Sequence, residues 1–366
     1  MRTNSDIASL RLYNQRIAAA RFTRPEEVVR WMGAMQAQDY QQALWAIGAR
    51  LQHGAIADVE QAVASGTILR TWPMRGTIHF VPAEDARWML KLSAPRMIAK
   101  DARRLEQLDL DETIMQRCKE IFHDALKGGR RLTRSEMTTL LEDEGIAAGS
   151  QRGYHILWYT SQTGDICIGP MQDKQQTFAL LDEWAPDSRV LSRADALAEL
   201  ASRYFTSHGP ATVHDFAWWA GLPVADARAG LAAAGQALSS FTSDGKEYWA
   251  TADAPGDQEL VEAYLLPGFD EYLLGYKDRS AVLPIEYAPR IVPGGNGVFQ
   301  PTIVVAGQVV GTWKRKLTKR SLSITLTPFT PLGESEGRAA AAAGRYSAFI
   351  GPPSSATVIE PSGFQG

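Results

Sequence analysis

The chain has 366 residues, 45% of them apolar, and a formal net charge of −3. So much apolar side chain can fill several small cores or two large ones, and the slight negative charge argues against indiscriminate coating of nucleic acid. No apolar run approaches membrane-spanning length, and the first residues lack the hydrophobic region of a signal peptide. Cys118 and Cys167 lie far apart, without a histidine or cysteine cluster. We therefore expect a cytoplasmic protein with no membrane segment, disulfide framework or metal site.

Residues 1–95 are expected to form a first unit in which helices precede a β-hairpin. Residues 23–32 carry Pro25 in their first turn, acids after it, and apolar residues at helical spacing, which together predict a helix. Residues 68–72 and 77–81 alternate in polarity around a Pro-Met-Arg-Gly turn. This pattern is typical of two strands joined by a tight turn.

A Gln-Ala-Gln segment follows the first of these helices. On a regular helix, Gln36 and Gln38 would point to nearly opposite sides, whereas extended backbone puts both side chains on one side. Because the segment falls near the end of the predicted helix, the backbone can turn there and aim both amides into one cavity. The amides could instead cap backbone groups of a polar loop. Asp39 could supply negative charge beside them, or cap a helix or turn.

The same plan recurs in residues 96–188 and 189–256. In the first of these units, Thr133 and Glu136 have the spacing of a capping box at the start of a helix, and residues 152–162 are expected to form a second helix. Helices followed by a two-stranded wing are the winged-helix plan, so we expect three such motifs in tandem. The strands expected for the two later wings are 165–169 with 177–180, around a turn at 170–173, and 238–241 with 247–250.

Residues 257–366 are expected to form a mixed, mainly β C-terminal domain, which makes the fold class α+β. Gly294-Gly295-Asn296-Gly297 is interpreted as a flexible hairpin tip rather than a phosphate cradle. The chain from residue 351 onward is expected to pack poorly. The remaining predicted elements are strands at 302–305, 308–313 and 321–327 and a helix at 334–349.

The segment Met35-Gln36-Ala37-Gln38-Asp39-Tyr40, followed by Ala43-Leu44-Trp45-Ala46-Ile47-Gly48, resembles the Gln-apolar-Gln signature of the AlkZ/YcaQ family of winged-helix DNA glycosylases. Because the second polar residue is Gln38 and not Asp, the resemblance is to the AlkZ-like branch. It implies a monofunctional DNA glycosylase that needs no cofactor or metal, acts as a monomer on double-stranded DNA, and is associated with the nucleoid. Other segments similar to family landmarks, which together cover most of the chain in order, are 70–79, 266–279 and 311–315.

The resemblance also implies that Gln36 and Gln38 are catalytic, with Asp39 as an accessory. Breaking an N-glycosidic bond passes through a transition state with oxocarbenium character, for which glycoside hydrolases commonly use two carboxylates. A glutamine amide does not titrate, so two glutamines suffice only when the leaving base is already activated, as a purine alkylated at N7 is. They would then position a water and stabilise charge at C1′. The implied substrates are cationic alkylated purines of the N7-alkylguanine type, extending to interstrand crosslinks, in DNA repair or self-resistance to a genotoxin.

Two groups of cations stand out against the net negative charge. Residues 314–320 hold five cations in seven positions, and a second group runs from Arg96 to Arg134. One such run usually marks a solvated face, but two in a chain of net negative charge suggest that cations are sorted onto a binding face. The side chains assigned to DNA contact are Lys314, Arg315, Lys316, Lys319, Arg320, Arg103 and Arg104 from these groups, together with Arg75.

Two other functions fit the same residues. Tandem winged helices can form a DNA-binding protein or transcriptional regulator without catalysis, and a scaffold that has lost DNA binding fits the mild acidity. An open basic channel that reaches both glutamines would favour the enzyme, and a bulky aromatic residue between them would favour the alternatives. His79 in the first hairpin is interpreted as structural, and no lysine close to the motif points to Schiff-base lyase chemistry.

Overall fold

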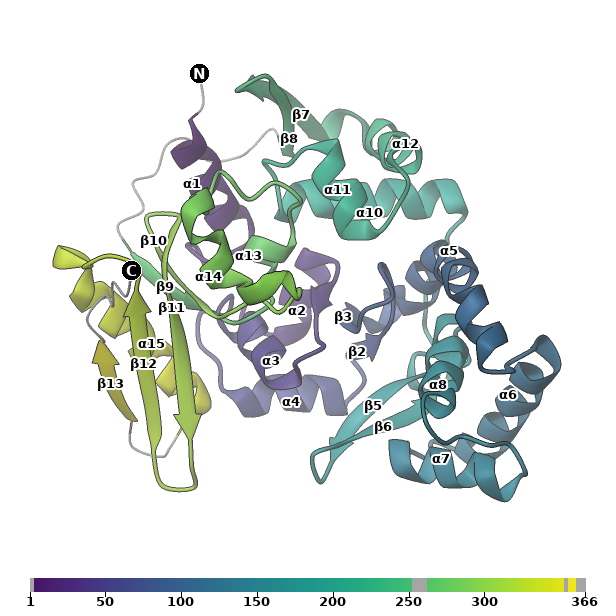
Figure 1. The fold of residues 1–366 in the computed structure, drawn as a ribbon. Helices are drawn as coiled ribbons and strands as arrows, with labels where there is room; N and C mark the ends of the chain where they lie inside the picture. The colour runs from purple at the N-terminus through teal and green to yellow at the C-terminus, as the bar shows by residue number, and fades with distance from the viewer. Residues whose placement is uncertain (1–2, 252–261, 352–354, 360–366) are drawn as a thin grey trace.

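The computed structural model describes residues 3–251, 262–351 and 355–359, which form the α+β fold expected from the sequence (Figure 1). The domain boundary expected at 256/257 falls outside these residues. None of the helices in the three ranges is long and apolar enough to cross a membrane.

The N-terminal part forms the helices and the hairpin that its sequence predicts. Pro25 starts the second helix and two acids follow it, at the positive end of the helix dipole. Gly33 caps that helix at its C-terminal end, and its φ of 78° suits a residue without a Cβ. The elements are α1 (Asn4–Asn14), α2 (Pro25–Met32), β1 (Met35–Gln36), α3 (Tyr40–Gly48), α4 (Ile56–Ala64), β2 (Ile68–Thr71) and β3 (His79–Pro82).

The next part begins with a helix of 22 residues that runs across the expected boundary at 95/96. Thr133 and Glu136 form both hydrogen bonds of the predicted capping box, and the helix predicted at 152–162 is present. The elements are α5 (Ala86–Gln107), α6 (Glu112–Leu126), β4 (Leu132–Thr133), α7 (Arg134–Asp143), α8 (Arg152–Gln162), β5 (Ile166–Gln172), β6 (Gln175–Leu180) and α9 (Leu181–Trp184).

The position of the turn between β5 and β6 corrects a prediction. The turn lies at residues 173–174 and not at 170–173, because β5 continues through Pro170. The pairing of β5 with β6 shifts register between Ile168 and Met171. Such an irregularity accommodates a proline, which has no N–H to donate to the neighbouring strand.

The hairpins of these first two parts join into one six-stranded sheet, in the order β1-β3-β2-β5-β6-β4. The two hairpins meet where Arg70 of β2 pairs with Ile168 of β5. At one edge, β1 pairs antiparallel with β3, so that Gln36 lies opposite His79. The Gln-Ala-Gln segment therefore leaves the sheet at an edge, where groups from other elements can reach it.

The third part packs its helices against a separate hairpin. The hairpin turn consists of Asp244 and Gly245, which both have positive φ, 46° and 72°, as a two-residue turn of this kind requires. This confirms the predicted hairpin. The elements are α10 (Arg193–Ser207), α11 (Val213–Ala220), α12 (Val224–Ala234), β7 (Leu238–Ser243) and β8 (Lys246–Thr251).

The C-terminal part contains a five-stranded sheet, in the order β13-β12-β11-β10-β9. The predicted hairpin around Ala306-Gly307, the strand after it and the following helix are all present. The elements are β9 (Ala263–Leu266), α13 (Glu271–Leu274), α14 (Ala288–Ile291), β10 (Thr302–Val305), β11 (Gln308–Leu317), β12 (Leu322–Pro328), α15 (Glu336–Ile350) and β13 (Ser355–Ile359).

Two predictions for this part are wrong. Residues 355–359, expected to pack poorly, form β13 parallel to β12, because α15 supplies the crossover that a parallel pair needs. Residues 294–297 are not a hairpin tip, since no strand of the described chain flanks them directly. The Gln300 N–H instead closes the loop by donating to the Ile291 carbonyl at 2.9 Å. Three glycines with φ between 65° and 77° allow this tight course.

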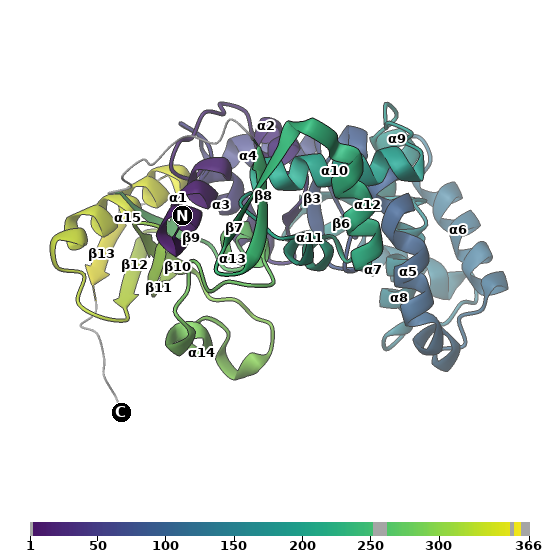
Figure 2. The same cartoon turned by 90° about the horizontal axis from the view of Figure 1, so that it is seen from above.

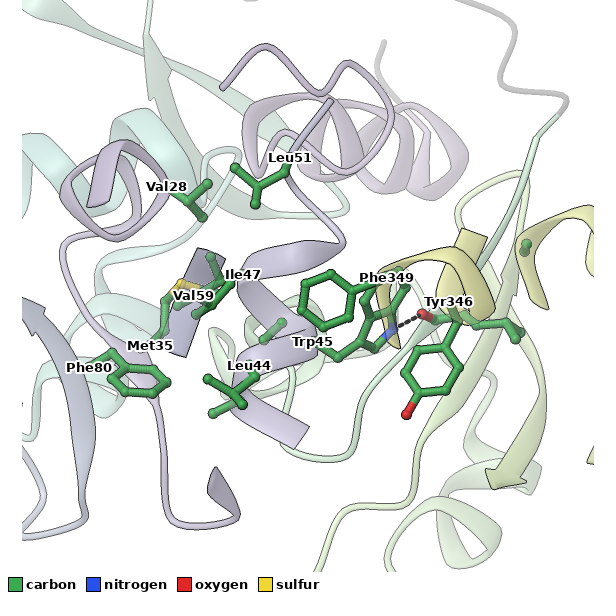
Figure 3. Packing of buried hydrophobic residues seen from close by; sticks show 14 of the residues in the cluster. Val28, Met35, Leu44, Trp45, Ile47, Leu51, Val59, Phe80, Tyr346 and Phe349 are labelled. Carbon is green, nitrogen blue, oxygen red and sulfur yellow. Dashed lines mark hydrogen bonds between the residues drawn. The ribbon is translucent and has the colours of Figure 1, made fainter. Parts of the chain in front are cut away.

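A shared core joins the N-terminal helices to the C-terminal sheet. Trp45 of α3 packs between Tyr346 and Phe349 of α15, with ring centroids 5.0 and 5.1 Å away (Figure 3). Its indole N–H donates to the Leu265 carbonyl of β9 at 2.7 Å. This burial of aromatic surface fixes α3 against β9, and therefore against α13, which follows β9. Viewed from above, the C-terminal sheet and α5 lie toward opposite ends of the molecule, with α10 and α11 between them (Figure 2).

Candidate active site

The Gln-Ala-Gln segment lies between the end of α2 and the start of α3. Gln36 is half-buried at the end of β1, Ala37 is fully buried, and Gln38 is exposed in the bend before α3. The backbone is therefore non-helical at both glutamines, as the sequence predicts. The exposure alternates as it does where residues two positions apart share a face, and a shared face of the two amides stays a prediction.

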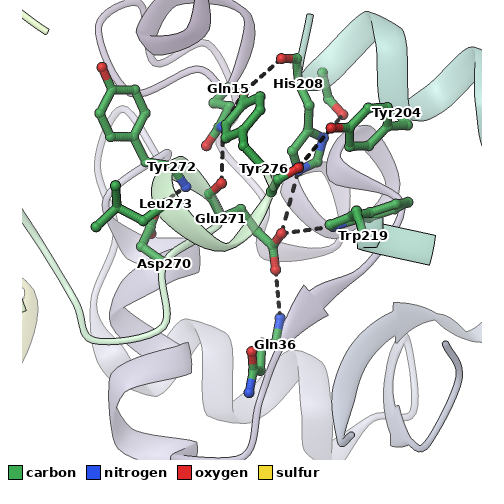
Figure 4. Close-up of polar contacts among 12 residues, drawn as sticks. Gln15, Gln36, Tyr204, His208, Trp219, Asp270, Glu271, Tyr272, Leu273 and Tyr276 are labelled. Carbon is green, nitrogen blue, oxygen red and sulfur yellow. Dashed lines mark hydrogen bonds and ion pairs between the residues drawn. The ribbon is translucent and has the colours of Figure 1, made fainter. Parts of the chain in front are cut away.

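Contacts from three other elements hold the backbone of this segment. The Ala37 N–H donates to the Ile78 carbonyl at 2.8 Å, and the Arg70 guanidinium donates to the Ala37 carbonyl at 3.1 Å. The Gln36 N–H donates to the Glu271 carboxylate at 3.0 Å (Figure 4). Neither side-chain amide, of Gln36 or of Gln38, forms a hydrogen bond with another described residue. The backbone is held while the two amides stay available.

Glu271 is a residue that the sequence reasoning missed. Its side chain is 1% exposed, and the oxygen that does not contact Gln36 accepts the indole N–H of Trp219 at 2.8 Å and lies 3.5 Å from His208 Nε2 (Figure 4). Trp219 belongs to α11 and His208 follows α10, so the carboxylate joins three distant parts of the chain. The only available signal was an acidic pair in the otherwise apolar stretch 263–276.

The Glu271 carboxylate is ionised near neutral pH. Burial raises its pKa, but the contact with His208 and the charges of His208, Arg75 and His79 lower the pKa to about 2. Burial and the charge of Arg75 lower the pKa of His79 to about 4. The site therefore combines a charged carboxylate with a neutral His79 near neutral pH.

The neighbouring Asp270 has a structural role. It caps α13 by accepting the Tyr272 N–H at 2.8 Å, and its two oxygens each accept a hydrogen bond from Arg50 at 2.9 Å. Arg50 is fully buried and also donates to the Gln15 side chain at 2.7 Å. This network fixes α13 relative to α1 and α3, and so sets the direction in which Glu271 points.

Asp39 and His79 have the structural roles that the sequence left open for them. Asp39 is exposed and caps α3, because its carboxylate accepts the Gln42 N–H at 3.2 Å. His79 is buried in β3, and its Nδ1 lies 2.8 Å from the Thr77 carbonyl oxygen. An accessory catalytic role for Asp39 stays a prediction.

The family model described as DNA glycosylase AlkZ-like matches residues 29–349 of this chain. The chain belongs to this family. It is 26% identical over 334 residues to an interstrand DNA cross-link repair glycosylase of Streptomyces sahachiroi, which covers 83% of this chain and 85% of that relative. The chain also superposes on the solved structure of Streptomyces sahachiroi DNA glycosylase AlkZ, with a TM-score of 0.76 and 22% sequence identity. The superposition covers 98% of this chain and 100% of the AlkZ chain, so the two have the same fold. The family expected from the Gln-Ala-Gln segment is confirmed.

For a member of the AlkZ-like family, the cations expected to contact DNA can now be placed. Arg75 lines a pocket of about 460 Å³ near α5 and α11. Its guanidinium donates to the Trp219 carbonyl at 2.6 Å and lies 4.8 Å from the centre of the Trp218 ring. None of the described residues that line this pocket is acidic, and the other cationic or titratable ones are Arg96, Lys100, His214 and Lys277.

The other cations that are expected to contact DNA lie in two separate regions of this AlkZ-like protein. Arg103 and Arg104 are near the end of α5, and Arg104 contacts Gln107 and Gln151. The cluster at 314–320 occupies the end of β11 and the turn into β12, at the other end of the molecule (Figure 2). Within it, Arg315 is half-buried against the Tyr346 hydroxyl, and the other four cations, Lys314, Lys316, Lys319 and Arg320, are exposed.

Proposed function

We propose that the protein is a monofunctional DNA glycosylase that releases cationic N7-alkylated purines, with Gln36 and Gln38 as its catalytic residues. One observation carries this proposal: the backbone of the Gln-Ala-Gln segment is fixed and non-helical, and within the described residues neither side-chain amide has a hydrogen-bond partner. An amide that served only to cap the loop would be bonded to a backbone group. Amides held out from a fixed backbone are arranged to bind a ligand or a water.

The two amides match what the release of a cationic base requires. Because an N7-alkylated purine leaves as a neutral base with the electron pair of its bond to C1′, no side chain has to protonate it. A water must then bond to C1′ and lose a proton to solvent, while positive charge at C1′ is stabilised. Amide oxygens accept hydrogen bonds from the water and present partial negative charge to the oxocarbenium, so Gln36 and Gln38 can perform both tasks.

Other features support the finer parts of the proposal. The first lysine in the sequence is Lys91, so no lysine lies close to the motif in the sequence as a candidate for amine attack on C1′. The Streptomyces sahachiroi relative is named for interstrand DNA cross-link repair, which supports crosslinked purines as substrates of this chain too. The three helix-and-hairpin parts are proposed to act as tandem winged helices, through which one monomer surrounds one duplex.

The rate of base release should be nearly constant between about pH 5.5 and 8.5, because a cationic base needs no proton from a side chain. The pKa of Glu271 is lowered to about 2 and that of His79 to about 4, so both groups keep one charge state throughout this window. Single-turnover rates on a duplex with one N7-methylguanine would measure the profile. A bell-shaped profile would indicate a general acid or base, such as Asp39, in place of the glutamine mechanism.

Reversing the charges of Lys319 and Arg320 in the turn between β11 and β12 should weaken duplex binding and reduce its salt dependence. Each phosphate contact that is lost should lower the slope of log affinity against log salt concentration by about 0.9. Anisotropy titrations at several salt concentrations measure this slope. The matched control reverses Arg338 and Arg345, two exposed arginines of α15, outside the three proposed winged helices. An identical slope in the hairpin variant and the control would exclude the hairpin from the DNA surface.

A further inference from the structure

We infer that Glu271 is a positioning residue for the reaction at Gln36. It holds the Gln36 peptide in place, and it supplies a buried negative charge that the two neutral glutamines lack. The cation it acts on is the oxocarbenium that develops at C1′. This inference rests on the proposed function and adds a residue that lies outside the Gln-Ala-Gln segment.

The position of Glu271 ties the reacting segment to the rest of the molecule. One oxygen accepts the Gln36 N–H at 3.0 Å, on the side of β1 that does not pair with β3. The other oxygen accepts the Trp219 N–H at 2.8 Å. An edge strand of two residues has little to fix it on its outer side, so a carboxylate held from α13 defines where the Gln36 side chain begins.

Glu271 differs from the adjacent Asp270 in its hydrogen-bond partners, which among the described residues include no arginine or lysine. Asp270 accepts two hydrogen bonds from Arg50, a full cation. The hydrogen bonds that Glu271 accepts come from neutral N–H groups, of Gln36 and Trp219. A buried carboxylate of this kind costs stability compared with an uncharged residue of similar size. A role in the reaction explains why the site carries a charge.

Two features of the surroundings set the effect of Glu271 on a nearby cation: neighbouring positive groups oppose it, and burial strengthens it. His208 Nε2 lies 3.5 Å from the carboxylate. The charges of His79, in β3, and of Arg75, in the turn before β3, also lower the pKa of Glu271. Arg75 directs its own hydrogen bond to the Trp219 carbonyl. Because the carboxylate is shielded from water, its field is screened less than that of an exposed acid such as Asp39.

The test compares Glu271→Gln with Asp85→Asn, a matched change in a buried carboxylate of another part of the chain, which accepts hydrogen bonds from Trp88 at 2.8 Å and Arg189 at 2.9 Å. The probes are two duplexes, one with a pyrrolidine abasic analogue that is protonated at neutral pH, and one with the neutral tetrahydrofuran analogue. The wild type should bind the cationic duplex more tightly. Glu271→Gln should lower this preference about tenfold or more, and slow single-turnover release of N7-methylguanine about tenfold to a hundredfold. Asp85→Asn should keep the preference even where it lowers thermal stability.

A purely structural role for Glu271 predicts a different result. Glu271→Gln would then lose thermal stability but keep the wild-type preference for the cationic duplex, and this outcome overturns the inference. The wild type alone provides a second test that needs no folded variant, since equal affinity for the two duplexes also overturns it. Failure of the proposed function is distinct, because the wild type would then release no N7-methylguanine at all.

Discussion

Replacing Gln36 or Gln38 by alanine should slow base release by about a hundredfold or more, while duplex affinity and thermal stability stay nearly unchanged. The backbone contacts from Glu271, Arg70 and Ile78 involve peptide groups and survive the substitutions. An amide directed at a water and at C1′ acts mainly in the transition state, so its loss appears in the rate and not in binding. Single-turnover release of N7-methylguanine and equilibrium binding to the same duplex measure the two quantities.

Gln41→Ala is the matched control for these variants. Gln41 is an exposed glutamine in the first turn of α3, directly after the motif, and its replacement should leave the rate at the wild-type value. In the proposed mechanism Gln36 and Gln38 act on one water, so the double variant should lose less than the product of the two single losses. If the double variant released N7-methylguanine at the wild-type rate, the glutamine mechanism would be contradicted.

Replacing Arg50 by methionine should lower the free energy of unfolding by about 3 to 5 kcal/mol. Arg50 is fully buried, and its two hydrogen bonds of 2.9 Å neutralise Asp270, which is 4% exposed. Methionine fills much of the same volume but leaves the carboxylate buried without its cation. Since Asp270 caps α13, base release should also fall, because Glu271 on the same helix loses its fixed position. Urea unfolding followed by tryptophan fluorescence measures the change in stability.

Arg24→Met provides the control for Arg50→Met. The Arg24 side chain is 62% exposed and pairs with Glu26 and Glu27 on the surface, so its loss should leave the free energy of unfolding nearly unchanged. Equal losses in the two variants would contradict the role assigned to the buried pair.

Elements marked by local signals could be predicted from the sequence. Pro25 starts α2, Thr133 and Glu136 cap α7, and Asp244-Gly245 turns the third hairpin, each through contacts within a few residues. The Gln-Ala-Gln segment was recognised for a related reason. Its two-residue spacing and its position after a helix already require extended backbone if both amides are to share a face.

Features set by contacts between distant residues could not be predicted in this way. Glu271 lies 235 positions from Gln36, and nothing local distinguishes its role from that of Asp270. β13 forms only because α15 returns the chain beside β12, and residues 355–359 depart from the expectation of a poorly packed tail for that reason. The course of β5 through Pro170 likewise depends on the irregular pairing that β6 provides.

The most direct test is incubation of the protein with two duplexes that carry the same methyl group at different positions of one guanine. The account predicts release of N7-methylguanine with an alkali-labile site left in the strand, and no release of O6-methylguanine, which is neutral and remains a poor leaving group. Release of O6-methylguanine at a comparable rate would contradict a mechanism based on two glutamines. Tight binding of both duplexes without any release would identify a DNA-binding protein that is not an enzyme.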